Sequence, residues 1–130
     1  MQAERIKQVA EEALEEIKAR DIVVLDTGKL TSLFDFMLVA TGDSVRQTKA
    51  LARNVMEKVK AAGGQVLGIE GEQTGEWVLV DLGSVIVHIM LPSARDYYNL
   101  EQLWGGTLAR RTSAARRGAD LRTDAGVTPP

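Results

Sequence analysis

Two runs of β-favouring residues flank a glycine-containing turn in residues 77–90, which read WVLVDLGSVIVHIM. Runs rich in valine and isoleucine that are separated by a short loop with Gly are typical of a β-hairpin. We predict strands over 77–81 and 85–90, joined by the three-residue loop 82–84. If Asp81 pairs with Val85, His88 stands opposite Val78 on an apolar face. A lone histidine there is usually a neutral, hydrogen-bonded core residue rather than a catalytic base.

The chain on either side of this hairpin alternates between helical and strand patterns. Apolar residues recur at the 3.6-residue period over 4–20 and again over 45–62, where Ser44 and Gln47 form a capping box and Gly63-Gly64 ends the helix. Short β-rich runs predict strands at 22–25, 35–41 and 66–69. Strand 35–41 is apolar on both faces, which favours a central position under helices. A third helix is predicted over 95–104 with Ser93 as its cap.

The resulting order, α-β-β-α-β-β-β-α, predicts an α/β fold: a mixed five-stranded sheet with helices packed on it. The length of 130 residues fits one domain. We place that domain at 1–108, because 109–130 contains few large apolar residues and five arginines, which is typical of a flexible tail. The charge divides at the same point. Residues 1–109 carry 11 Lys and Arg against 16 Asp and Glu, a net −5, whereas 110–130 carry +3.

Composition excludes several kinds of site. The chain has no Cys and one His, so disulfides, thiolate chemistry, Cys-based zinc sites and multi-His metal sites are excluded. No apolar run approaches the ~18 residues of a membrane helix, and residues 1–20 lack the pattern of a secretory signal. The acidic domain argues against a nucleic-acid binder and favours either a basic partner or no partner.

Two short segments could hold phosphate or metal. Thr41–Ser44 lies between a strand and a helix, where backbone N–H groups often bind anions, but Asp43 would repel one, and a tight turn with a helix cap is the better interpretation. Glu70 and Glu72 could bind Mg²⁺, but two carboxylates without a third ligand more often form a solvated turn.

The segment 95–104, RDYYNLEQLW, contains three of the six aromatic residues of the chain. Tyr97 and Trp104 share a helical stripe that can dock on the sheet, whereas Tyr98 points elsewhere. Tyrosine and tryptophan carry much of the binding energy at protein interfaces, so this segment is a candidate contact surface.

Four motifs occur in order between about Ile6 and Trp104. They are Asp35-Phe36-Met37 with Thr41-Gly42, Gly68-Ile69-Glu70-Gly71, the strands Glu76–Asp81 and Val85–Ile89, and the segment Arg95–Trp104. Together they resemble the Iojap-like ribosomal silencing factors. The tail after Trp104 lies outside this resemblance.

The resemblance implies a small mixed-sheet fold related to nucleotidyltransferases, without enzymatic activity or a cofactor. It implies a cytoplasmic homodimer that binds the large ribosomal subunit through ribosomal protein fourteen, at the face that meets the small subunit. Occupying that face would block subunit joining and lower translation when nutrients run out. It implies no membrane partner and no specific nucleic acid, although the tail could touch rRNA phosphates.

We expect the partner to contact aromatic side chains and carboxylates. The candidate residues are Glu70, Trp77, Asp81, His88, Tyr97, Tyr98, Glu101 and Trp104, with the carboxylates facing Lys or Arg of the partner. Some of them could instead form the homodimer surface. Nucleotidyltransferase chemistry needs a pair of acidic residues on a strand to hold metal, and the later predicted strands of this chain contain no such pair. This agrees with a fold that has lost that chemistry.

Two alternatives remain at this stage. One is a metal-dependent nucleotidyltransferase-like enzyme or a nucleotide-binding protein that uses Thr41–Ser44 with Glu70 or Asp81. Micromolar binding of ATP or GTP with Mg²⁺ would favour it. The other is an RNA-binding adaptor that acts through the arginine tail, for which deletion of 109–130 would abolish ribosome association.

Overall fold

The computed structural model describes residues 2–98 and 109–112, which form three helices and six strands. The helices are α1 (Ala3–Glu16), α2 (Val45–Ala61) and α3 (Pro92–Tyr98). The strands are β1 (Arg20–Asp26), β2 (Phe36–Thr41), β3 (Gly68–Glu70), β4 (Trp77–Asp81), β5 (Val85–Met90) and β6 (Ala109–Thr112). The predicted α/β class and the order of the elements through α3 are confirmed.

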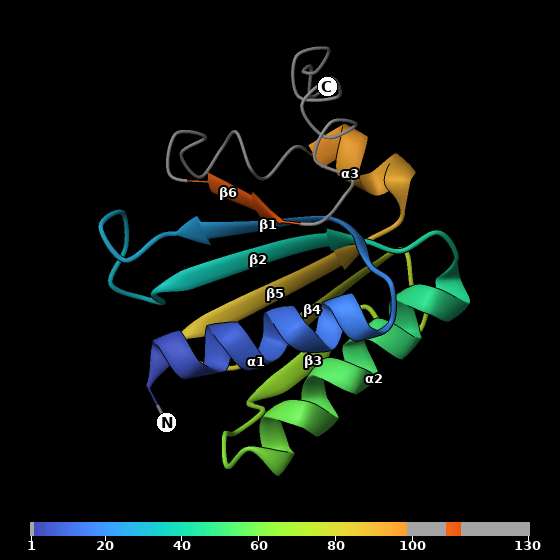
Figure 1. The fold of residues 1–130 in the computed structure, drawn as a ribbon. Coiled ribbons are helices and arrows are strands. Elements are labelled where there is room, and N and C mark those ends of the chain that lie inside the picture. The colour runs from blue at the N-terminus through green and yellow to red at the C-terminus, as the bar shows by residue number, and fades with distance from the viewer. Residues whose placement is uncertain (1, 99–108, 113–130) are drawn as a thin grey trace.

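The strands form one mixed sheet in the order β3-β4-β5-β2-β1-β6, with α1 and α2 lying side by side across it (Figure 1). Strands β2 and β5 are parallel, because α2 and the β3–β4–β5 segment return the chain to the same end of the sheet, and the other neighbours are antiparallel. The predicted central position of the second strand is confirmed, since β2 lies between β5 and β1.

The helix ends show where local chemistry decides. At α2, Ser44 caps the start by accepting from the N–H of Gln47, and Gly63 ends the helix at φ 96°, as the capping box and the Gly pair predict. The first helix was predicted to reach residue 20, and this is wrong, because it ends at Glu16. Lys18 takes the left-handed conformation (φ 68°), and the N–H of Ala19 returns to the carbonyl of Leu14, a turn usually signalled by glycine.

The hairpin register differs from the prediction by one residue. Asp81 pairs with Ile86 instead of Val85, and His88 stands opposite Leu79 instead of Val78. The reason is a shorter turn. Leu82 N–H bonds to the Val85 carbonyl, so only Gly83 and Ser84 connect the strands, and Gly83 supplies the positive φ (88°) that a two-residue turn needs. A slip of one residue exchanges the two faces of β4 relative to β5, so the predicted β4 neighbour of His88, Val78, is wrong, and Trp77, Leu79 and Asp81 share its face instead.

The sheet buries different amounts on its two faces. Under α1 and α2 lies the main core, to which the strands contribute alternating residues that include Val78, Val80, Val85, Val87 and Ile89. On the opposite face a smaller buried cluster joins Val23, Leu25, Met37 and Val39, beside partly buried Phe34. The second face is therefore buried at β1 and β2 and becomes more exposed toward β4 and β3.

Two features near the C-terminal part were not predicted. Helix α3 begins at Pro92, and its first bond runs from the N–H of Arg95 to the carbonyl of Leu91, so Ser93 lies inside the helix and is not its cap. Proline suits the first helical position, because its fixed φ is already helical.

Strand β6 is an addition to the five predicted strands and pairs with the edge of β1. Its sequence, ARRT, lacks the alternating apolar pattern that indicates a strand. Strands pair through main-chain N–H and C=O groups, so the residue types alone did not predict this pairing. The rest of the predicted tail, 113–130, lies outside the described residues, and the domain boundary at residue 108 stays a prediction. Within 2–98 and 109–112, no helix is long and apolar enough to cross a membrane.

Candidate partner-binding face

The observed register brings four of the eight predicted contact residues to one side of the sheet. Glu70 on β3 pairs with Leu79 on β4, and Leu79 pairs with His88 on β5. Trp77 and Asp81 lie two residues before and after Leu79 along β4, so they share its face. All of these side chains lie on the face of the sheet that points away from α1 and α2. We call the group formed by Glu70, Trp77, Leu79, Asp81, Ile86 and His88 the second-face patch.

Burial within the second-face patch is graded. His88 is 6% exposed, whereas Trp77, Leu79, Asp81 and Ile86 are half-buried and Glu70 is exposed. By contrast, Val78 and Val80, which alternate with them toward the helices, are fully buried. The patch thus presents one large aromatic ring and two aliphatic side chains together with two carboxylates, a combination that suits contact with a protein surface.

Trp77 and His88 form a pair within this patch. They are diagonal neighbours on β4 and β5, and the indole Nε1–H of Trp77 donates to Nδ1 of His88 at 2.9 Å. The ring centroids are 5.7 Å apart and the planes are inclined by 52°. Burial lowers the pKa of His88 to about 4, so the imidazole is neutral near pH 7. His88 therefore acts as an acceptor for Trp77.

The two carboxylates differ in what holds them. Asp81 Oδ1 accepts from the N–H of Gly83 at 2.9 Å, so this side chain also shapes the hairpin turn. Glu70 is exposed and is followed by Gly71, which has φ 82°. A Cβ on Gly71 would overlap the carbonyl oxygen of Trp77, so glycine is required for the chain to pass so closely to β4. Of the two carboxylates, Glu70 is the more exposed and is therefore the better candidate for pairing with a partner.

The other four predicted contact residues are described less fully. Tyr97 and Tyr98 lie in α3, of which only the backbone is described at these positions. Glu101 and Trp104 lie outside the described residues. Leu79 and Ile86 were missed as members of the patch, although strict alternation from Trp77 along β4 would have found Leu79.

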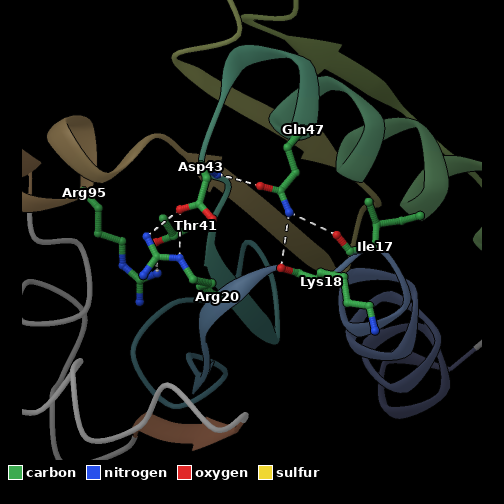
Figure 2. A network of polar contacts seen from close by, with 7 residues as sticks. All are labelled: Ile17, Lys18, Arg20, Thr41, Asp43, Gln47 and Arg95. Atoms are coloured by element: carbon green, nitrogen blue, oxygen red, sulfur yellow. Dashed lines mark hydrogen bonds and ion pairs between the residues drawn. The ribbon is translucent and has the colours of Figure 1, made fainter.

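A polar network fixes the end of the sheet at the Thr41–Ser44 turn (Figure 2). Arg20 binds Asp43 through Nε at 2.8 Å and Nη2 at 2.6 Å. The side chain of Gln47 accepts from the N–H of Asp43 at 2.7 Å and donates to the carbonyls of Ile17 and Lys18. This segment was a candidate phosphate turn, but here the carboxylate of Asp43 already engages the arginine, and Gln47 joins α2 to the end of α1.

Arg95 anchors α3 to the same end of the sheet. It is 3% exposed, and its Nη1 donates to Oγ1 of buried Thr41 at 2.8 Å. Among residues 2–98 and 109–112 there is no group of three or more His, Asp or Glu side chains that could hold a metal ion.

Comparisons with known proteins agree on one family. The family model described as "Ribosomal silencing factor during starvation" (RsfS) matches residues 1–127, so the expectation that the tail lies outside the resemblance is wrong. Ribosomal silencing factor RsfS of Chromobacterium violaceum is 60% identical over 106 residues, which are 82% of this chain and 87% of that protein.

More distant and structural relatives extend this result. Mitochondrial assembly of ribosomal large subunit protein 1 of Mus musculus is 32% identical over 94 residues, 70% of this chain and 41% of that protein. A crystal structure of a Chromobacterium violaceum protein superposes with a TM-score of 0.80 at 56% identity, covering 88% of this chain and 96% of that one. The fold is therefore shared with a solved structure at high sequence identity.

Proposed function

Since this chain belongs to the RsfS family of ribosomal silencing factors, we propose that it silences ribosomes by occupying the joining face of the large subunit. It binds ribosomal protein fourteen there and keeps the small subunit from joining, which lowers translation when nutrients are limiting. It works by steric exclusion in the cytoplasm, without turnover of a substrate, and is a homodimer when free. Kinship of the fold with nucleotidyltransferases stays a prediction.

Family membership supports the coarser part of this proposal, a ribosome-associated silencing role. The name of the mouse relative connects that protein with assembly of the ribosomal large subunit, which favours the large subunit as the partner of this chain. The choice of ribosomal protein fourteen and of the subunit-joining face comes from the motif resemblance.

The observation that carries the proposal is the second-face patch. Half-buried Trp77, Leu79 and Ile86 offer apolar area that a partner can cover, and exposed Glu70 can pair with a cationic side chain. The net charge of −5 over residues 1–109 complements a basic ribosomal surface and would accelerate encounter.

Co-sedimentation with purified large subunits tests this assignment by charge reversal. Glu70→Lys places a cation against the proposed basic partner and should weaken binding about tenfold or more, because like charges across an interface are strongly unfavourable. Glu12→Lys makes the same change of charge at an exposed position on α1, on the other side of the sheet, and should leave binding unchanged.

The two variants also distinguish the possible failures. Normal binding by Glu70→Lys, or equal loss in Glu12→Lys, would move the interface away from the second-face patch while keeping the partner. No sedimentation of the unaltered chain with large subunits would reject the function itself.

A further inference from the structure

The hydrogen bond between Trp77 and His88 joins a half-buried ring to an almost fully buried one. Trp77, the first residue of β4, pairs with Met90 of β5, and His88 lies two residues before Met90. The side chains of Trp77 and His88 therefore meet diagonally on the same face. Diagonal neighbours in an antiparallel pair are within reach of aromatic side chains. The bond of 2.9 Å therefore arises from the strand register and needs no movement of the backbone.

The chemistry of the two rings fixes the direction of this bond. An indole can only donate through Nε1–H, so Nδ1 of His88 must be unprotonated, and the proton of the neutral imidazole lies on Nε2. A doubly protonated imidazole would place two donors face to face and break the bond. His88 must stay neutral to hold Trp77.

The surroundings of His88 keep it neutral. Across the strands it pairs with Val39 of β2 and Leu79 of β4, both apolar, and it is 6% exposed. Burial lowers its pKa to about 4, well below neutral pH. The acceptor at Nδ1 is thus constantly available under the conditions in which the protein works.

We propose that His88 is a positioning residue for partner binding, which acts by holding the indole of Trp77 in one orientation on the second-face patch. This inference rests on the proposed function. His88 is too buried to contribute contact area itself, whereas Trp77 is half-buried and available. A ring fixed before binding loses less conformational freedom when the partner arrives, and the complex is correspondingly tighter.

Two substitutions separate the hydrogen bond from mere filling of space. His88→Asn replaces Nδ1 by an amide oxygen that can accept from the indole, and His88→Leu fills the site without an acceptor. We expect His88→Leu to weaken binding to purified large subunits about three- to tenfold, the range of a single net hydrogen bond. His88→Asn should bind as the unaltered chain does.

Nuclear magnetic resonance reads the positioning directly. The chain has one His and two Trp, so the imidazole nitrogen signals belong to His88 alone, and the indole N–H signal of Trp77 is identified by its loss in Trp77→Phe. The unaltered chain should show the proton on Nε2. The indole N–H signal should move upfield in His88→Leu and stay near its place in His88→Asn.

Each outcome decides the inference. A proton on Nδ1 in the unaltered chain overturns it without any variant, and so does an indole signal that His88→Leu leaves in place. It is also overturned if His88→Leu moves the indole signal without weakening binding, or if His88→Asn binds as weakly as His88→Leu. If the unaltered chain does not bind large subunits, the proposed function fails, while the indole and imidazole signals still determine whether His88 holds Trp77.

Discussion

His88 is a polar residue that the fold accommodates at the expense of stability in acid. In the folded chain its pKa is lowered to about 4 by burial, whereas in the unfolded chain it returns to its ordinary value near 6.5. Between these two pH values the unfolded chain binds a proton that the folded chain excludes. The free energy of unfolding therefore rises with pH through this window.

The resulting pH dependence can be measured by urea unfolding. Lowering the pH from 7.5 to 4.5 should remove roughly 2–3 kcal/mol of stability through His88, beyond what the carboxylates contribute. His88→Asn cannot be protonated there and should lack this part, so the difference between the two chains isolates it. Parallel pH profiles for the two chains would mean that the histidine is not neutral and buried.

Gln47, in the first turn of α2, connects this helix to the Thr41–Ser44 turn and to the end of α1. Its amide accepts from the N–H of Asp43 at 2.7 Å and donates to the carbonyls of Ile17 and Lys18, at 3.1 and 3.2 Å, where α1 ends (Figure 2). Those carbonyls have left the helical pattern, so the amide supplies the partner that the helix cannot. One side chain thus fixes the spacing between α1 and the start of α2.

Gln47→Ala should lower the free energy of unfolding by about 1–3 kcal/mol, because it leaves three main-chain groups without this partner. Gln73→Ala removes the same side chain from an exposed turn between β3 and β4 and should change stability by less than about 0.5 kcal/mol. Thermal unfolding of the two variants makes the comparison, and equal destabilisation would show that the network around Gln47 carries little of the stability.

The bounds of helices and strands were predictable where a residue type strongly favours one local conformation. Ser44, Gln47 and Gly63 marked the ends of α2, and the β-branched runs located β4 and β5. The end of α1 was not predictable, because Lys18 adopts a conformation that its residue type rarely takes. The hairpin register was missed because the sequence does not show whether Leu82 lies in the loop or pairs with Val85 across it. The hydrogen bond from the Leu82 N–H to the Val85 carbonyl shows that it pairs.

The candidate site could be predicted in part for the same reasons. Trp77 and Asp81 were identified from a motif, and the structure places them with Glu70 and His88 on one face. Leu79 was missed, because the predicted register put the wrong residues of β4 beside His88. The bond from Trp77 to His88 joins positions eleven residues apart and depends on that register, so no local pattern signals it.

The molecule as a whole has two unlike sides. Helices α1 and α2 cover one face of the sheet (Figure 1). The strand register places the second-face patch on the other face. A protein that acts by steric exclusion needs one binding side and enough bulk behind it to obstruct a third body. In the proposed function the patch binds the large subunit, and the helical layer supplies bulk toward the incoming small subunit.

Subunit joining, measured by gradient sedimentation, shows whether the bound chain excludes the small subunit. Large subunits are incubated with the unaltered chain or with Glu70→Lys, small subunits are added, and the fraction of joined ribosomes is determined. The unaltered chain should lower that fraction in proportion to the large subunits it occupies, and Glu70→Lys should require about tenfold more protein for the same effect. A joined fraction that stays constant while the chain sediments with large subunits would contradict silencing by exclusion.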